Sequence, residues 1–268
     1  MKHVCFVGDS HLGAIKRGWD KIATDTLAVD AVFFGAPQPV SNTLTYRCGK
    51  LRLDDGQMHL VVSTAPNGGA VLDITPFDAI VFCGLGLTPL ALFYLYKTYR
   101  GDFQRGADTA KHILSRAAYE AVCRGMYEDT QAVKLARTIG EDMRKPAWLI
   151  PASYPSELIL WSRRKETVTD IINNEDEETI VEAFDSVLRD LSNSGINVLK
   201  QPPETKSSTA FTNQIYSTGS KRLTDEVELH DLDFVHMNAD YGALVLKVFV
   251  KMLAETNGSS GAPGIYHG

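Results

Sequence analysis

Three features are scarce in this sequence of 268 residues: cysteines, an excess of basic side chains, and long apolar runs. The four cysteines, Cys5, Cys48, Cys83 and Cys123, form no CxxC pair, and three of them lie in apolar or helix-like surroundings, which predicts reduced core thiols. A formal net charge of −6 disfavours a nucleic-acid partner, which requires clustered lysine and arginine. No apolar run reaches the ~18 residues of a membrane span. The apolar run at the N-terminus is also too short for the hydrophobic region of a signal peptide. The sequence therefore predicts a cytoplasmic protein with no membrane partner.

The composition that remains is that of a globular domain. Hydrophobic residues make up 44% of the chain and charged residues 22%, which excludes a disordered, collagenous or coiled-coil chain. No internal repeat and no linker-like tract divides the sequence, so we expect a single domain over residues 1–256. The Gly- and Ser-rich residues 257–268 are expected to form a flexible tail.

Short apolar runs alternate with helical patterns along the chain, which is typical of an α/β protein with a mostly parallel sheet covered on both faces. We expect a three-layer α/β/α sandwich with a five-stranded, flavodoxin-like sheet. Its helices include residues 12–23, a stripe over residues 180–191 and residues 240–254. The predicted strands cover residues 3–7, 27–34, 78–83, 147–151 and 196–200.

Two insertions interrupt this alternation. Residues 43–64 alternate apolar and polar positions around Asp54-Asp55-Gly56, which predicts a β-hairpin closed at that turn. Residues 88–144 have a helical pattern that is long for one crossover, which predicts a helical cap. The aromatic cluster within it, between Phe93 and Phe103, forms the core of that cap, stacks on a sugar or lines an acyl pocket.

Ser10 follows the first predicted strand, where the chain turns into a helix. Open α/β sheets bind ligands at this carboxyl end of their strands, and a helix N-terminus there favours a developing oxyanion. The alternative is that Asp9 and Ser10 only cap the helix. A serine nucleophile also needs a base.

A base is found near the other end of the chain. Asp233 and His236 directly precede the last predicted helix, and an Asp three residues before a His can fix the imidazole tautomer. Because the loop into that helix lies on the same edge of the sheet as Ser10, we expect Ser10, Asp233 and His236 to meet as a catalytic triad. Alternatively, Asp233 belongs to a helix-capping loop that contains an incidental histidine.

These residues resemble the conserved blocks of the SGNH or GDSL hydrolase superfamily. Gly8-Asp9-Ser10 is similar to its first block, and Asp233 to His236 is similar to its DxxH block, with Asn238 and Tyr241-Gly242 as its continuation. The resemblance implies a flavodoxin-like sandwich in which Ser10 is the nucleophile, His236 the base and Asp233 its orienting partner. It implies no cofactor.

The resemblance also implies an oxyanion hole formed by Ser10, Gly35 and a third position. That third position is an asparagine in the superfamily, but this chain has Gly86 in the sequence Gly84-Leu85-Gly86. The alternative is that Gly35 and Gly86 are glycines only because the backbone at these positions requires a conformation or a tight turn that other residues disfavour. Asn42, Asn67 or the loop of residues 151–157 could supply the missing donor.

Other residues carry weaker indications. His11 follows the nucleophile and could contact a substrate, although a polar residue in the first turn of a helix needs no function. The histidines show no metal-ligand spacing, so we expect no metal site.

The sequence as a whole predicts a serine esterase that cleaves a small acyl ester. The substrate class implied by the resemblance is a small molecule or a carbohydrate ester, including an O-acetyl sugar. Two alternatives stay open: a carbohydrate O-acyltransferase with the same triad, and a sugar-binding protein of this fold without turnover.

Overall fold

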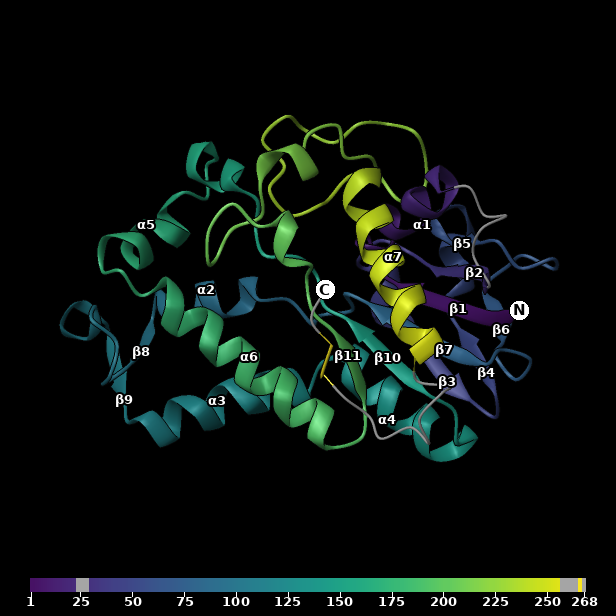
Figure 1. The fold of residues 1–268 in the computed structure, drawn as a ribbon, viewed down its shortest axis with the longest axis horizontal. Helices are drawn as coiled ribbons and strands as arrows, with labels where there is room; N and C mark the ends of the chain where they lie inside the picture. Colours follow the sequence, from purple (N-terminus) through teal and green to yellow (C-terminus); the bar gives the residue numbers. More distant parts are fainter. Residues whose placement is uncertain (23–28, 256–264, 267–268) are drawn as a thin grey trace.

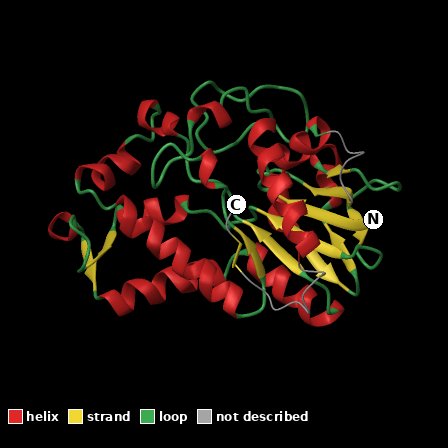
Figure 2. Cartoon of the chain, viewed as in Figure 1, coloured by secondary structure: helices red, strands yellow, loops and turns green. Residues whose placement is uncertain are grey.

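The computed structural model describes residues 1–22, 29–255 and 265–266, and its centre is a mixed sheet of seven strands (Figures 1 and 2). The strand order across this sheet is β12-β11-β10-β7-β1-β2-β5. Neighbouring strands are parallel, except that β5 runs antiparallel to β2. The strands are β1 (Lys2–Gly8), β2 (Val29–Gly35), β5 (Val62–Ser63), β7 (Ala79–Cys83), β10 (Ala147–Ile150), β11 (Asn197–Leu199) and β12 (Ile265–Tyr266).

The sheet therefore has two edge strands more than the five strands that the sequence predicted. The five predicted strands form β1, β2, β7, β10 and β11, which are the five consecutive parallel strands of the sheet. Strands β5 and β12 have two residues each, too short to leave a periodic pattern in the sequence. Because Ile265–Tyr266 pairs with β11, the predicted tail of residues 257–268 contains a strand; its other residues, 257–264 and 267–268, lie outside the described part.

Helices cover both faces of the sheet. Val4 and Phe6 of β1 pack into a core with α1 and α7, whereas Cys5 and Val7 pack into a second core with α4 and α6. Burial on both faces explains why the strands read as continuous apolar runs. The helices are α1 (Leu12–Lys21), α2 (Leu90–Tyr96), α3 (Arg116–Glu128), α4 (Gln131–Met143), α5 (Glu166–Asn173), α6 (Glu177–Asn193) and α7 (Ala239–Glu255).

The predicted hairpin is present with a different turn. Strands β3 (Thr45–Arg47) and β4 (Lys50–Arg52) pair antiparallel around Cys48-Gly49, where both residues have positive φ. A third strand, β6 (Val71–Asp73), then pairs with β4. The Asp54-Asp55-Gly56 sequence does not form the hairpin turn. Instead, Asp54 Oδ1 accepts a hydrogen bond from Gly56 N and caps a short 3-10 helix, Asp55–Leu60.

The predicted helical cap of residues 88–144 divides between two parts of the molecule. Helix α4 packs on β7 and β10 as part of the sheet layer. Helices α2, α3 and α5, with the parallel ribbon of β8 (Tyr99–Gly101) and β9 (His112–Leu114), form a helical lobe at the left of Figure 1, and α6 runs from this lobe to the sheet. Phe93 and Tyr96 are fully buried, so these two aromatics belong to the core.

Buried charged groups hold the lobe together. Asp176 is fully buried before α6 and accepts hydrogen bonds from the Tyr96 hydroxyl (2.5 Å) and from the backbone of Arg105 (2.8 Å). Arg100, 1% exposed, binds the Tyr96 carbonyl and reaches the Asp170 carboxylate at 3.0 Å. Because these groups are paired, their burial is tolerated.

Candidate active site

Ser10 lies at the carboxyl end of the central strand β1, in the turn that leads into α1. This turn is closed by backbone hydrogen bonds from Leu12 N to Asp9 O and from Gly13 N to Ser10 O. The N-cap position of α1 is His11, whose side chain makes no capping hydrogen bond. The hydroxyl of Ser10 is hydrogen-bonded to His236, so Ser10 is not the cap of this helix.

The loop before α7 holds Asp233 and His236 as a hydrogen-bonded pair. His236 Nδ1 lies 3.1 Å from Asp233 Oδ2, and Asp233 Oδ1 accepts hydrogen bonds from the backbone N–H groups of Val235 (2.9 Å) and His236 (2.7 Å). The loop is tied to the segment after β10 by a hydrogen bond from Ser156 N to Phe234 O. These contacts fix the plane of the imidazole and leave its Nε2 free to face Ser10.

The two halves of the predicted triad meet. His236 Nε2 lies 2.9 Å from Ser10 Oγ, although the residues are 226 positions apart. The side chains of Asp233 and His236 retain 19% and 24% exposure, so solvent reaches part of both. The geometry is that of a nucleophile, a base and an orienting carboxylate within hydrogen-bond reach of one another.

Helix packing explains why residues so distant in sequence coincide. Ser10 precedes α1 and His236 precedes α7, and these two helices pack closely on the same face of the sheet. At the crossing, a Cβ on Gly242 would lie 1.8 Å from the carbonyl oxygen of Ala14. Asn238 fixes the start of α7, because its side chain donates to the carbonyls of Ile215 (2.7 Å) and Thr218 (2.9 Å).

The electrostatics of the pair favour an ionised Asp233. Burial raises the pKa of this carboxyl, but hydrogen bonds from the His236 side chain and from two backbone N–H groups, together with the His236 charge, lower it by more, so the net pKa lies below its ordinary value. Asp233 is therefore a carboxylate at neutral pH and can stabilise an imidazolium on His236.

Asp9 has a structural role that its place before Ser10 does not reveal. Its carboxylate is buried, accepting from His11 N at 3.0 Å and from Leu85 N at 2.8 Å. It therefore ties the turn after β1 to the loop after β7. The second bond spans 76 positions and could not be found from local sequence, although an aspartate directly before the serine of a predicted triad is itself a signal.

The glycines predicted for the oxyanion hole both have backbone reasons to be glycine. A Cβ on Gly35, the last residue of β2, would lie 2.1 Å from Gly8 O. Gly86 has φ +87°, a conformation that L side chains rarely adopt, and a Cβ there would contact Thr130 rather than the triad residues. The structure thus supports the backbone explanation for both residues, and their N–H groups stay predicted donors.

The Gly86→Asn variant is expected to lose stability without gaining activity. An added side chain at φ +87° strains the backbone, which costs ~1 kcal/mol or more, and the amide would project toward Thr130. A thermal melt and kcat measured on the same variant check this. A tenfold rise in kcat, ~1.4 kcal/mol of transition-state stabilisation, would instead show that the amide reaches the oxyanion.

The other candidate donors lie at different places around the sheet. Asn42 is exposed in a short 3-10 helix, Val40–Thr43, that follows β2, and Asn67 is exposed in the loop between β5 and β6. Neither side chain is hydrogen-bonded to Ser10, Asp233 or His236 among the described residues. The loop of residues 151–157 does contact the triad loop, through Ser156.

His11 lies directly against His236. Its ring stacks on that of His236 with centroids 5.4 Å apart and an interplanar angle of 27°. It also lines a small cavity of about 20 Å³ with Ser153, whose buried hydroxyl has no partner among the described residues. Burial lowers the pKa of His11, Asp9 and Asp233 oppose this, and His236 adds to it. His11 therefore stays neutral where an exposed histidine would gain a proton.

This lowered pKa has a consequence for stability. The unfolded chain takes up a proton on His11 near the ordinary histidine pKa of ~6.5, whereas the folded protein does so only at lower pH, so the free energy of unfolding falls as pH decreases below about 7. His11→Gln is expected to flatten this dependence by up to ~1.4 kcal/mol per pH unit. Urea unfolding between pH 7 and 5 measures it, with His59→Gln as the exposed control. An equal slope in wild type and His11→Gln would refute this account.

Comparisons with known proteins add little. No protein-family model matches the chain, and no curated protein matches it. Among solved structures, a DUF4886 family protein from Bacteroides uniformis ATCC 8492 is similar with a TM-score of 0.35 and 11% sequence identity, over 100% of this chain and 88% of that chain. A similarity this low says nothing about the chemistry of this chain.

Metal-binding clusters and membrane-spanning helices are absent from the described part of the chain. Within residues 1–22, 29–255 and 265–266, no group of three or more His, Cys, Asp and Glu side chains is arranged to hold a metal ion. Over the same residues, no helix has the length and apolar character needed to cross a bilayer. All four cysteines are free thiols, and Cys5, Cys83 and Cys123 are buried as predicted, whereas Cys48 is exposed.

Proposed function

We propose that this protein is a serine hydrolase that cleaves a small acyl ester through an acyl-enzyme on Ser10. The single observation that carries the proposal is the continuous chain from Ser10 Oγ to His236 Nε2 (2.9 Å) and from His236 Nδ1 to Asp233 (3.1 Å). The order of the five parallel strands, β2-β1-β7-β10-β11, supports a flavodoxin-like sandwich and membership of the SGNH or GDSL superfamily.

The reaction follows from this geometry in two steps. Ser10 Oγ attacks the ester carbonyl while its proton passes to His236 Nε2, and the imidazolium is stabilised by Asp233. When the tetrahedral intermediate collapses, the C–O bond to the alcohol breaks and His236 returns the proton to that leaving oxygen. Water then attacks the acyl-enzyme, with His236 again accepting and donating a proton, and releases the carboxylic acid.

Stabilisation of the tetrahedral oxyanion is assigned to the start of α1. The backbone N–H of Ser10 has no hydrogen-bond partner among the described residues, and it lies at the positive end of the helix. The N–H of Gly86 is unpaired in the same sense. A backbone donor at Gly86 would take the place of the superfamily asparagine without a side chain.

The substrate class comes from the resemblance. We propose an O-acetyl or similarly small acyl group on a carbohydrate or other small molecule. The partial exposure of Asp233 and His236 leaves a side from which such an ester and then water can approach.

Labelling with a fluorophosphonate followed by peptide mass spectrometry tests the proposal. Only a serine activated by a neighbouring base should react, and the adduct identifies the residue. We expect modification of the peptide that contains Ser10 and none in His236→Ala. Modification at a different serine, or none in the folded wild type, would reject an activated nucleophile at position 10.

Asp233→Asn is expected to lower kcat by ~10²-fold or more, with a much smaller change in KM. The amide oxygen of the new side chain would keep the bonds from the backbone N–H groups of Val235 and His236, which turns its NH₂ group toward His236 Nδ1. Nδ1 must then accept, so Nε2 carries the proton and cannot receive one from Ser10. Asp231→Asn, an exposed change two residues away, is the control. An equal loss in both variants would contradict this explanation.

A further inference from the structure

The ring of His11 has a fixed place beside the candidate triad. The backbone N–H of His11 donates to Asp9 Oδ1 at 3.0 Å, which holds the residue at the start of α1. The ring lies close to Gly84, where an added Cβ would come within 3.0 Å of His11 Cδ2. Because Gly84 has no side chain, the loop after β7 leaves room for this ring.

The contact between His11 and His236 is made by the faces of the rings and not by polar atoms. The two rings stack with centroids 5.4 Å apart and an interplanar angle of 27°, which lies within the range of about 4.5–7 Å typical of aromatic pairs. In the described part of the chain, neither ring nitrogen of His11 has a hydrogen-bond partner. His11 therefore supplies a flat surface beside His236 and takes no part in the hydrogen bonds that link Ser10, His236 and Asp233.

This surface restrains a motion that the hydrogen bonds permit. Asp233 holds His236 by one edge of its ring, through Nδ1 at 3.1 Å. A ring held at one edge can tilt, and a tilt moves Nε2, on the other side of the ring, away from Ser10 Oγ. The His11 ring blocks this tilt on one face and keeps water from that face, which strengthens the bond to Asp233. A misplacement of ~1 Å between reacting atoms can cost ~10²-fold in rate.

His11 provides this surface without adding a charge. The titratable side chains around it are Asp9 on its own turn, Cys83 at the end of β7, Tyr241 of α7, and Asp233 and His236 of the loop before α7. Burial raises the pKa of Cys83 and that of Tyr241, so both are uncharged. Burial also lowers the pKa of His11, against the opposing effect of Asp9 and Asp233. At pH 8 an uncharged ring therefore lies beside His236 and does not repel an imidazolium there.

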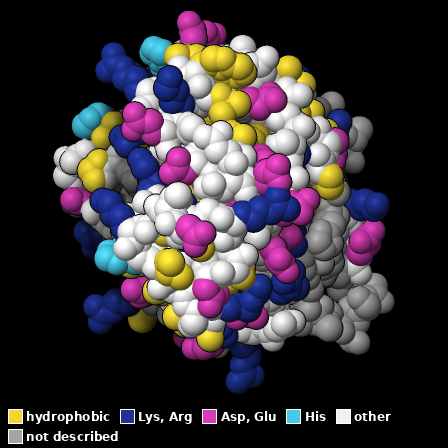
Figure 3. All heavy atoms as spheres, turned by 90° about the vertical axis from the view of Figure 1, so that its left-hand side faces the viewer, with side chains coloured by type: hydrophobic (Ala, Val, Ile, Leu, Met, Phe, Trp, Pro, Cys, Tyr) yellow, Lys and Arg dark blue, Asp and Glu magenta, His cyan; other side chains and the backbone are white. Residues whose placement is uncertain are grey.

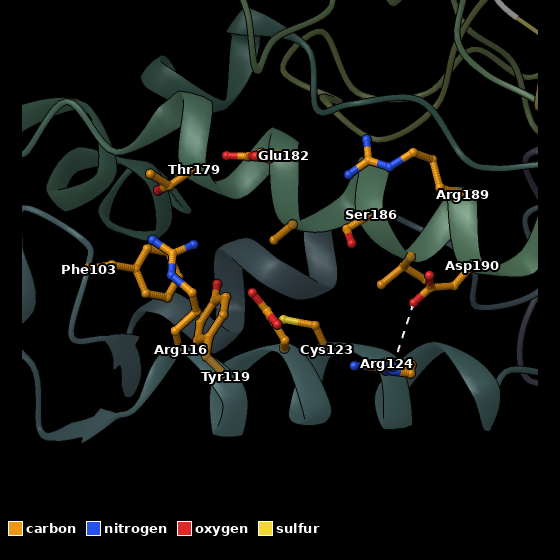
Figure 4. Close-up of a pocket in the computed structure, with 13 residues that line it drawn as sticks. Phe103, Arg116, Tyr119, Cys123, Arg124, Thr179, Glu182, Ser186, Arg189 and Asp190 are labelled. Carbon is orange, nitrogen blue, oxygen red and sulfur yellow. Dashed lines mark ion pairs between the residues drawn. The ribbon is translucent and has the colours of Figure 1, made fainter.

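The charges of the helical lobe are balanced and lie elsewhere. Figure 3 shows basic and acidic side chains interspersed over the exposed face of the lobe. The hollow of about 250 Å³ between α3 and α6 has the same mixture (Figure 4): its lining includes Arg116, Arg124, Arg189, Glu120, Glu182 and Asp190. None of the residues that line this hollow also lines the small cavity beside His11. A substitution in the hollow is therefore a suitable distant control for a substitution at His11.

We propose that His11 is a positioning residue of the candidate triad, whose ring face holds the imidazole of His236 with Nε2 toward Ser10. This role rests on the proposed function, because it acts through His236 as the proton acceptor. No covalent step is added: the proton passes from Ser10 Oγ to His236 Nε2, and His11 neither gains nor loses one. Since the ring face makes the contact, another flat ring can replace His11, whereas a polar side chain without a ring cannot.

Two substitutions separate the ring of His11 from its polar atoms. His11→Phe keeps a flat ring and removes both nitrogens, and the cavity of about 20 Å³ beside the ring gives the larger side chain some room. His11→Gln keeps a polar group and removes the ring. For p-nitrophenyl acetate at pH 8, we expect kcat to fall about tenfold in His11→Gln with a much smaller change in KM. In His11→Phe, kcat should stay within about threefold of wild type.

A double substitution tests whether His11 acts through His236. In a His236→Ala background, His11→Gln should leave the residual rate unchanged, because the ring then has no imidazole to hold. Urea unfolding at pH 8 shows whether each variant is folded. His59→Gln, a change at an exposed histidine, and Glu182→Gln in the hollow of the lobe are the controls, with kcat expected to be unchanged.

Three results would each overturn the role of His11 alone. The first is wild-type kcat in His11→Gln. The second is an equal loss in His11→Phe and His11→Gln, which would assign the effect to a ring nitrogen. The third is a loss from His11→Gln in the His236→Ala background as large as in wild type. Failure of the proposed function gives a different result, because folded wild type would then neither hydrolyse the ester nor react with a fluorophosphonate at Ser10, and both proposals would be rejected.

Discussion

Ser10→Ala is expected to abolish ester hydrolysis, with a fall in kcat of ~10⁴-fold or more, because the variant has no nucleophile and His236 no proton to accept. Stability should change little. The Ser10 hydroxyl does not cap α1, and its hydrogen bond in the structure is to His236, so the change in free energy of unfolding should be within ~1 kcal/mol. Hydrolysis of p-nitrophenyl acetate and urea unfolding measure the two quantities separately.

The matched control is Ser207→Ala, which removes an exposed hydroxyl far along the chain from the triad and should leave both quantities unchanged. Retention of most of the activity in Ser10→Ala would show that hydrolysis occurs elsewhere. Loss of stability and activity together would show instead that Ser10 is a structural residue.

Gly242→Ala is expected to have the largest effect on folding. The new Cβ would lie 1.8 Å from the carbonyl oxygen of Ala14 and 2.5 Å from its carbonyl carbon, and both atoms belong to helix backbone that cannot turn aside. Helices α1 and α7 would have to separate, at a cost of ~3 kcal/mol or more. Since these helices carry the two halves of the triad, kcat should fall even where the variant is still folded.

Gly140→Ala provides the matched control for this prediction. Gly140 also lies inside a helix, α4, but nothing lies within 4 Å of the position of an added Cβ. Alanine there should stabilise the protein by about 0.5–1 kcal/mol, the difference in helix propensity. Urea unfolding of both variants gives the comparison, and equal stability of Gly242→Ala and wild type would refute the close crossing.

The sequence could predict the central strands because they are buried on both faces and are continuous apolar runs. Strands β5 and β12 were not predicted because each has only two residues, too few to show a periodic pattern of apolar and polar positions. The hairpin was placed at the wrong turn because Asp54-Asp55-Gly56 and Cys48-Gly49 compete within a few residues, and the stronger local signal caps a 3-10 helix.

The site was predictable to the extent that topology determines it. Ser10 follows β1 and His236 precedes α7, and both positions lie at the same edge of the sheet. Their meeting could therefore be inferred without coordinates. The bond from Asp9 to Leu85 and the stacking of His11 on His236 could not. Both depend on the conformation of loops whose residues have no periodic pattern, and the positive φ of Leu85 is set by tertiary contacts rather than by its own preference.

The packing of α1 on α7 makes the candidate site a property of the finished fold. The ribosome makes Ser10 226 residues before His236, so the serine lacks this partner while the whole central sheet region is being synthesised. His236 reaches Ser10 only when α7 docks on α1, a contact between segments far apart in sequence and therefore late in folding. A chain cut short before position 236 keeps the five central strands and lacks the base. Under the proposed function, ester cleavage is thus a direct assay for completion of the fold.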